Sequence, residues 1–283
     1  MPIPYRLNPL GISVREELPL TFTAVEASTV KLTATGSPTV SGLHYRLGTS
    51  GPWLPYTIGN TINLAAGEKV QFWNSVNRLS TGNSTYCYFV LSGKVSATGN
   101  LMSLLNYADT IPQYGFRKLF TGASALVSCP HDLTAKSIGA YGCAGTFELC
   151  SGMLTPIREI AIDTLAENCF DSMYARCGSI PYLSHVKATV MAPYCCTLMY
   201  YMCGNITSAY IPDVTLADYC FRRMFYYSSS LSGINTDITS WHQTATFEWL
   251  SGVAAFGTFI KTAALPEEYG TSRIPSGWTV INK

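Results

Sequence analysis

The chain has 283 residues, of which 47% are hydrophobic and 12% are charged, and its formal net charge is +1. This composition is typical of packed globular proteins and excludes a disordered tail. The near-neutral charge, with no basic run longer than Arg222-Arg223, argues against a nucleic-acid partner.

The N-terminal residues 1–8 show no apolar segment after their basic residue, so we expect no secretory signal there. No stretch approaches the roughly eighteen consecutive apolar residues of a membrane-spanning helix. We therefore expect neither export by that route nor membrane insertion.

The first hundred residues alternate apolar and polar side chains between turns rich in Gly, Pro, Ser and Asn, which is typical of strands. The predicted strands are 29–34, 44–47, 61–64 and 69–73. A spacing of about ten residues favours a small all-β sandwich over a βαβ fold. We predict a sandwich-like attachment or oligomerisation domain over residues 1–98.

A block is then repeated five times between Thr110 and Leu231: Ser/Thr and an aliphatic residue, then Tyr-x-Phe/Cys, then two larger residues. The anchors of the copies are Tyr114, Tyr141, Asn168, Tyr194 and Tyr219, which gives periods of 27, 27, 26 and 25 residues. Units of this length cannot each close a core, so they stack on their neighbours. The repeat predicts a solenoid.

Each unit is predicted to begin with a helix. Thr110, Thr164 and Thr215 are each followed three residues later by Gln, Glu or Asp, which resembles a capping box. The last copy also carries an apolar stripe at helical spacing, made of Leu216, Cys220, Phe221, Met224 and Phe225. The fourth copy departs from this pattern because Val190 and Pro193 occupy its cap positions.

Short extended segments follow these predicted helices, at 180–183, 206–212 and 231–234. One helix and one short strand per repeat make an α+β fold, with the solenoid over residues 99–239. The aromatic-rich residues 240–283 no longer keep the period, and we expect them to form a cap over the last coil.

Six of the ten cysteines recur at two phases of the repeat: Cys150, Cys177 and Cys203 at one, Cys169, Cys195 and Cys220 at the other. A cysteine at a constant phase is most simply a small buried side chain that faces the next coil. A metal or disulfide ladder is the alternative, but no CxxC or paired His spacing accompanies it.

The last unit, residues 216–221 followed by Met224-Phe225 and Leu231, resembles the leucine-rich repeats of the BspA type. These occur in surface and phage-encoded proteins of gut Bacteroidetes. The resemblance covers about residues 110–280, and residues 45–72 resemble the β-domain that often precedes such repeats. It implies a non-enzymatic protein, either a bacterial adhesin or a structural protein of phage particles.

Catalytic or metal chemistry has little support in the sequence. His44, His131, His185 and His242 share no phase of the repeat, and the pair His131-Asp132 lacks a Gly-x-Ser-x-Gly nucleophile. Glu267-Glu268 with Glu148 or Glu159 could act as glycosidase carboxylates only if folding brought them together. We predict no catalytic residue, no metal site and no cofactor.

Tyrosine occurs 18 times, and adjacent pairs such as Tyr200-Tyr201 and Tyr226-Tyr227 could place one ring inward and its neighbour outward. Outward rings could contact a sugar or a protein partner, or they could cover the flank of adjacent coils. Tyr201 and Tyr227 are the predicted outward, partner-binding residues.

These observations favour a bacteriophage virion component, such as a capsid or tail decoration or a fibre. Its expected partners are other virion proteins or copies of itself, and a host-surface glycan or protein. The low charge favours an oligomer or assembly. The alternative is a BspA-type adhesin on the bacterial cell surface, and a weaker alternative is a glycan-active enzyme.

Overall fold

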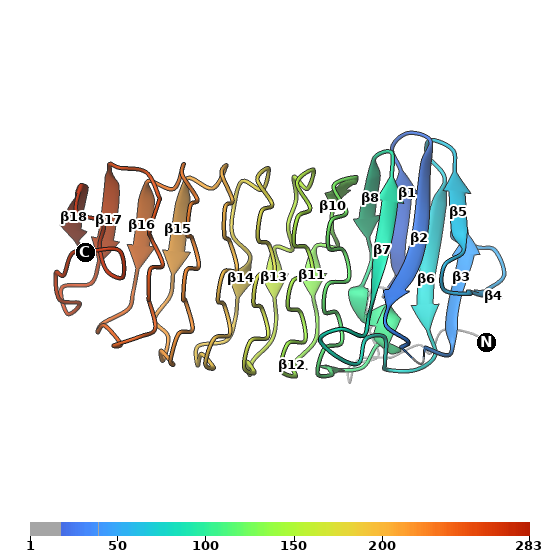
Figure 1. The fold of residues 1–283 in the computed structure, drawn as a ribbon, viewed down its shortest axis with the longest axis horizontal. Coiled ribbons are helices and arrows are strands. Elements are labelled where there is room, and N and C mark those ends of the chain that lie inside the picture. The colour runs from blue at the N-terminus through green and yellow to red at the C-terminus, as the bar shows by residue number, and fades with distance from the viewer. Residues whose placement is uncertain (1–17, 39) are drawn as a thin grey trace, which may run out of the picture.

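A computed structural model describes residues 18–38 and 40–283 of the chain. An N-terminal β-sandwich leads directly into a β-solenoid of about seven turns, and the two lie end to end along one long axis (Figure 1). The N-terminal residues 1–17, where we considered an export signal, lie outside the described residues.

Two sheets form the sandwich, and their strands are antiparallel except at one edge of the larger sheet. The larger sheet has the order β10 (Leu126–Ser128), β8 (Val95–Thr98), β1 (Leu20–Ala24), β6 (Lys69–Asn74), β3 (Leu43–Leu47) and β4 (Leu54–Pro55). The smaller sheet has the order β5 (Thr61–Leu64), β2 (Ser28–Thr35) and β7 (Tyr86–Ser92). Strands β2, β3, β5 and β6 lie where the sequence predicts strands. Phe22 of β1 packs edge to face on Phe89 of β7 at 4.8 Å, which joins the sheets.

Short parallel strands follow in the solenoid, after the 3₁₀ helix η1 (Leu101–Leu105). One pair is β9 (Thr110–Ile111) with β12 (Ser137–Ile138), and one sheet is β11 (Asp132–Leu133), β13 (Glu159–Ile160) and β14 (His185–Val186). The last sheet is β15 (Ser208–Ile211), β16 (Gly233–Thr236), β17 (Gly257–Lys261) and β18 (Trp278–Asn282). The strands of successive coils thus pair side by side in parallel ladders.

The predicted helices are absent, and the α+β fold class is wrong. Within the described part of the chain, η1 is the only helical element. The five segments predicted as helices are instead runs of turns at 113–122, 140–149, 167–176, 193–202 and 218–227, and a sixth run of turns at 243–252 lies in the predicted cap. The fold is therefore almost entirely β.

Backbone hydrogen bonds explain why a helix does not form in these turn segments. Alternate N–H groups close tight turns, as Arg117 does on the carbonyl of Tyr114 at 3.0 Å. The N–H groups between them donate to the next coil, as Phe116 does to Gly142 at 2.7 Å. After its first turn, a helix would direct its N–H groups to its own carbonyls and would not form this ladder between coils.

The turn segments repeat every four residues, which is close to the helical period of 3.6. Left-handed backbone recurs at this interval, at Tyr114, Lys118 and Gly122 in the first segment. The inward side chains share the interval, as Phe116 and Phe120 show. A four-residue apolar spacing cannot by itself distinguish this turn run from a helix.

The predicted N-cap residues form bridges between coils. Thr110 of β9 pairs with Ser137 of β12, and their hydroxyl oxygens lie 2.7 Å apart. Isolated parallel bridges join Ser137 to Thr164 and Val190 to Thr215. Val190 is no exception at such a position, because a β-branched residue suits extended backbone.

A stack of aromatic rings runs lengthwise through the core. It runs through Phe89, Phe120, Phe147, Tyr174, Tyr200 and Phe225, with ring centroids 5.3–5.8 Å apart. The coil pattern extends past residue 239, because Phe225 donates its N–H to Trp249, which is fully buried. The first ring, Phe89, belongs to the sandwich, so the two parts of the molecule share one core.

Candidate interaction surface

The turn segments form one outward side of the solenoid, and their last residues make an exposed row along it. This corner row consists of Gly122, Leu149, Arg176, Met202, Tyr227 and Gly252. All six have left-handed backbone, with φ between 54° and 76°. Each of the first five donates its N–H to the next coil at 2.7–2.9 Å, which keeps the row in register.

Of the two tyrosines predicted to face outward, Tyr227 lies in the corner row and is 53% exposed. Tyr201 is half-buried, and its ring centroid lies 6.0 Å from that of Tyr226. Tyr226 meets Tyr227 edge to face at 4.5 Å. Folding therefore joins the two predicted residues through Tyr226, which was not predicted as part of the site.

The prediction that each tyrosine pair has one inward and one outward ring holds only in part. Tyr200 is buried beside Tyr201, as the pair suggested. In the second pair neither ring is fully inward, because Phe225 takes the buried position. The pKa of Tyr226 is raised, first by its hydrogen bond with Tyr227.

Arginine side chains lie over these rings. The guanidinium of Arg176 is 5.7 Å from the ring centre of Tyr201, and that of Arg223 is 5.2 Å from the ring centre of Tyr226. Arg223 also donates to Glu248 at 2.6 Å. Sequence reasoning missed Arg176 and Met202, which a search of the tenth position of each turn segment would have found.

Other tyrosines on this side are engaged with each other. Tyr114 stacks on Tyr141 at 5.5 Å, and Tyr194 stacks on Tyr219 at 5.0 Å. Asn168 takes the corresponding position in the coil between these two pairs, so the ring stacking is not continuous. Rings stacked coil to coil cover each other's faces, which matches the flank-covering alternative for these four residues.

The repeated cysteines are buried core residues. Cys150, Cys177 and Cys203 each direct the thiol to the carbonyl of an aromatic residue in the preceding coil, at 2.9–3.1 Å. Ser228 takes the same position in the next coil and donates to Tyr200 at 2.7 Å. All ten cysteines are free and buried, so they fill the core as small side chains.

The residues considered for catalysis are dispersed. His131 contacts its neighbour Asp132 at 2.6 Å on the exposed surface. Glu148 lies 3.9 Å from Lys118 on the turn side, while Glu159 belongs to β13 on a strand face. In residues 18–38 and 40–283, no three His, Cys, Asp or Glu side chains are placed to hold a metal ion.

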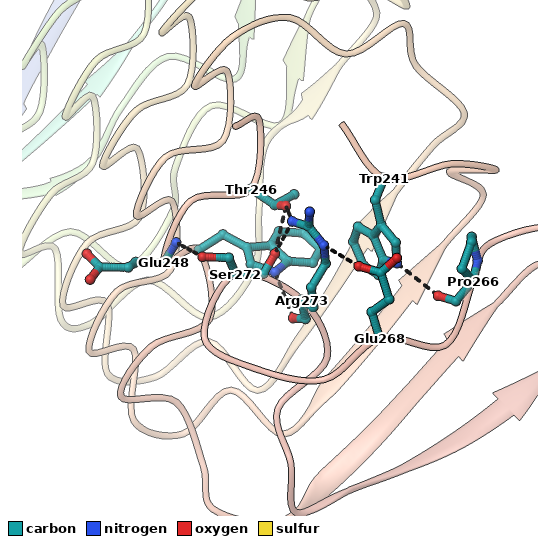
Figure 2. Close-up of polar contacts among 8 residues, drawn as sticks. Trp241, Thr246, Glu248, Pro266, Glu268, Ser272 and Arg273 are labelled. Atoms are coloured by element: carbon teal, nitrogen blue, oxygen red, sulfur yellow. Dashed lines mark hydrogen bonds and ion pairs between the residues drawn. The ribbon is translucent and has the colours of Figure 1, made fainter. Parts of the chain in front are cut away.

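Glu268 and its surroundings hold the last coils together (Figure 2). Arg273 donates to Glu268 at 2.9 Å and to Thr246 at 3.1 Å, and its guanidinium lies 5.2 Å from the Trp241 ring centre. The indole N–H of Trp241 donates to Pro266 at 2.8 Å. Since these polar groups satisfy one another's hydrogen bonds, the cluster stabilises the contact between the last coils.

Within the same described ranges, the structure contains no helix long and apolar enough to span a membrane. Comparison with protein-family models, with curated proteins and with solved structures finds no match. The fold and the exposed corner row define the class as a β-solenoid protein with an N-terminal β-sandwich. Function is therefore argued from its surfaces.

Proposed function

We propose that the chain is a non-enzymatic structural and binding protein, and specifically a component of a bacteriophage particle such as a decoration or fibre. In this role the sandwich attaches to the particle or to other copies of the chain. The solenoid presents its outward side chains for assembly or host attachment.

The shared core is the observation that carries this proposal. Stacking from Phe89 to Phe120 crosses from the sandwich into the solenoid, and β8 pairs with β10 across the same junction. A close-packed core resists bending at this point. A rigid rod with a distinct domain at one end suits the presentation of a surface at a distance from an attachment point.

The virion location rests on the resemblance to BspA-type repeats in phage-encoded proteins. The same resemblance supports a bacterial cell-surface adhesin as the second candidate. The exposed aromatic and arginine side chains of the corner row and its neighbours fit either role, because Tyr, Met and Arg are enriched at protein interfaces.

Mass spectrometry of purified phage particles, together with the membrane fraction of the host cells, tests the location. We expect the chain in particles at a constant ratio to the other structural proteins. Recovery only with cell membranes would contradict the virion role and favour the adhesin.

Glycan-release assays on host polysaccharide test the absence of catalysis, and we expect no turnover. Turnover that is lost on a single carboxylate substitution, such as Glu267→Gln, would overturn the non-enzymatic assignment.

A further inference from the structure

Three of the six corner-row residues carry exposed apolar or aromatic side chains. Leu149, Met202 and Tyr227 are 41%, 42% and 53% exposed. Each is set outward by left-handed backbone, with φ of 64°, 54° and 58°. Such backbone is unfavourable for residues with a Cβ, so the outward projection of these side chains is imposed by the ladder rather than by local preference.

Arg176 lies in the row between Leu149 and Met202, and no acidic side chain of residues 18–38 and 40–283 forms an ion pair with it. Two cations of the turn segments do form ion pairs, Lys118 with Glu148 and Arg223 with Glu248. Arg176 has only the ring of Tyr201 beneath its guanidinium. A planar guanidinium that is free to form two parallel hydrogen bonds is suited to a carboxylate.

The ring of Tyr227 is held in place by its neighbours before any partner binds. It leans over Gly252, where a Cβ would lie only 2.6 Å from Cδ1 of the ring. Tyr226 meets the same ring edge to face. An aromatic side chain fixed on both sides loses little conformational entropy on binding.

We propose that the corner row is the docking surface for a protein partner. The partner presents a carboxylate to Arg176, flanked by apolar side chains that cover Leu149, Met202 and Tyr227. Arg176 and Tyr227 are two coils apart, or about 10 Å at the usual strand spacing. This inference rests on the proposed particle role and names the contact by which the solenoid side would serve it.

A protein is favoured over a saccharide by the residue types in the row. Leucine and methionine gain from contact with apolar side chains, whereas the hydroxyl-rich surface of a saccharide would leave them poorly covered. Tyr, Met and Arg are the types enriched at the centres of protein interfaces.

Photo-crosslinking in purified particles tests this proposal. Tyr227→p-benzoylphenylalanine places a crosslinker in the row, and Val190→p-benzoylphenylalanine places one at a residue that is 60% exposed elsewhere on the solenoid. We expect the first to crosslink to one particle protein, through a peptide that contains Asp or Glu, and the control not to.

Charge substitutions in the Tyr227→p-benzoylphenylalanine background test the role of Arg176. We expect Arg176→Glu to lower the crosslink yield about tenfold or more, and Arg176→Lys to keep most of it. Circular dichroism on each purified variant verifies the fold.

Particles that contain the chain but give no crosslink from position 227 would overturn the inference alone. A saccharide adduct, or a yield unchanged by Arg176→Glu, would overturn it as well. Absence of the chain from particles would contradict the proposed function itself, so the two failures are distinguishable.

Discussion

Left-handed backbone at residues other than glycine is a recurring feature of the turn segments. Tyr114, Lys118 and Leu149 have φ of 62°, 54° and 64°. Each such residue costs roughly 1–2 kcal/mol relative to a right-handed conformation. Their N–H groups all donate to the next coil, so hydrogen bonding between coils offsets this strain.

Gly122 and Gly178 are positions where the effect of backbone strain can be measured without steric crowding. A Cβ would meet no atom within 4 Å at either position. Gly122 has a φ of +74°, whereas Gly178 lies outside the left-handed region. We expect Gly122→Ala to lower the free energy of unfolding by about 1 kcal/mol, and Gly178→Ala to leave it equal or slightly higher. Urea denaturation measures both, and equal losses would contradict the assigned strain.

Burial makes the cysteine thiols resist ionisation. The pKa of Cys87, Cys143 and Cys220 is raised by burial from 9.0 to about 12. The unfolded chain therefore releases thiol protons from about pH 9, while the folded chain keeps them to about pH 12. Linkage then requires that this contribution to stability is complete below pH 9 and is lost between pH 9 and pH 12.

We expect the urea midpoint to stay constant up to about pH 8.5 and to fall from pH 9 to pH 11. Buried Tyr174 and Tyr200 also have raised pKa values and contribute in the same direction. Cys143→Ala serves as the control, because removing one buried thiol should make the fall shallower. A midpoint that rises over this range would contradict the assignment.

The parallel ladder of the solenoid is interrupted between β14 and β15. The N–H of Lys187 donates to the preceding coil at 3.1 Å and that of Asp237 does so at 2.9 Å. Pro212 takes the corresponding position in β15's coil and has no N–H to donate. A cavity of 60 Å³ lies beside this gap, with Val186 and Ile211 among its lining residues.

Pro212→Lys restores the missing N–H at the edge that faces β14. We expect slower hydrogen exchange over residues 208–214 in this variant, because a backbone bond to β14 closes the gap. Exchange detected by mass spectrometry measures the effect, and exchange over 233–236 provides the internal reference. Unchanged exchange at 208–214 would show that another feature holds the strands apart.

The molecule as a whole has one hydrophobic core that extends from Leu20 to Trp278. Phe120 occupies the junction, since its ring contacts Phe22 and Phe89 of the sandwich and Phe147 of the solenoid. Stability in solenoids is normally transmitted only between neighbouring repeats. Here the first coil has the sandwich as its neighbour and stabilises it in return.

Phe120→Ala should therefore weaken both parts of the molecule. We expect a loss of about 3–5 kcal/mol, with faster hydrogen exchange in β7 as well as in the turn segment 140–149. Phe256→Ala is the control, because Phe256 is 80% exposed and its loss should change stability by at most about 0.5 kcal/mol. Faster exchange confined to the solenoid would contradict the shared core.

Much of the architecture could be predicted from particular residues. Alternation in residues 28–35 and 69–74 marks strands of the sandwich, because one face of each strand is buried. The anchors from Tyr114 to Tyr219 show the solenoid and its period. The exposure of Tyr227 was predicted too, whereas Arg176 and Met202 were missed because the residue type at this position of the repeat differs from copy to copy.

The sequence by itself determined the period of the coils, the inward phase of the aromatic residues and the burial of the cysteines, since these depend on which side chains leave water. The tertiary structure decided the turn conformation. Phe116 and Phe120 have the spacing of a helical stripe, yet the N–H of Phe116 donates to the next coil. Only the neighbouring coil supplies that acceptor. The preference for turns over a helix therefore depends on contacts between repeats, and the sequence of a single repeat does not reveal it.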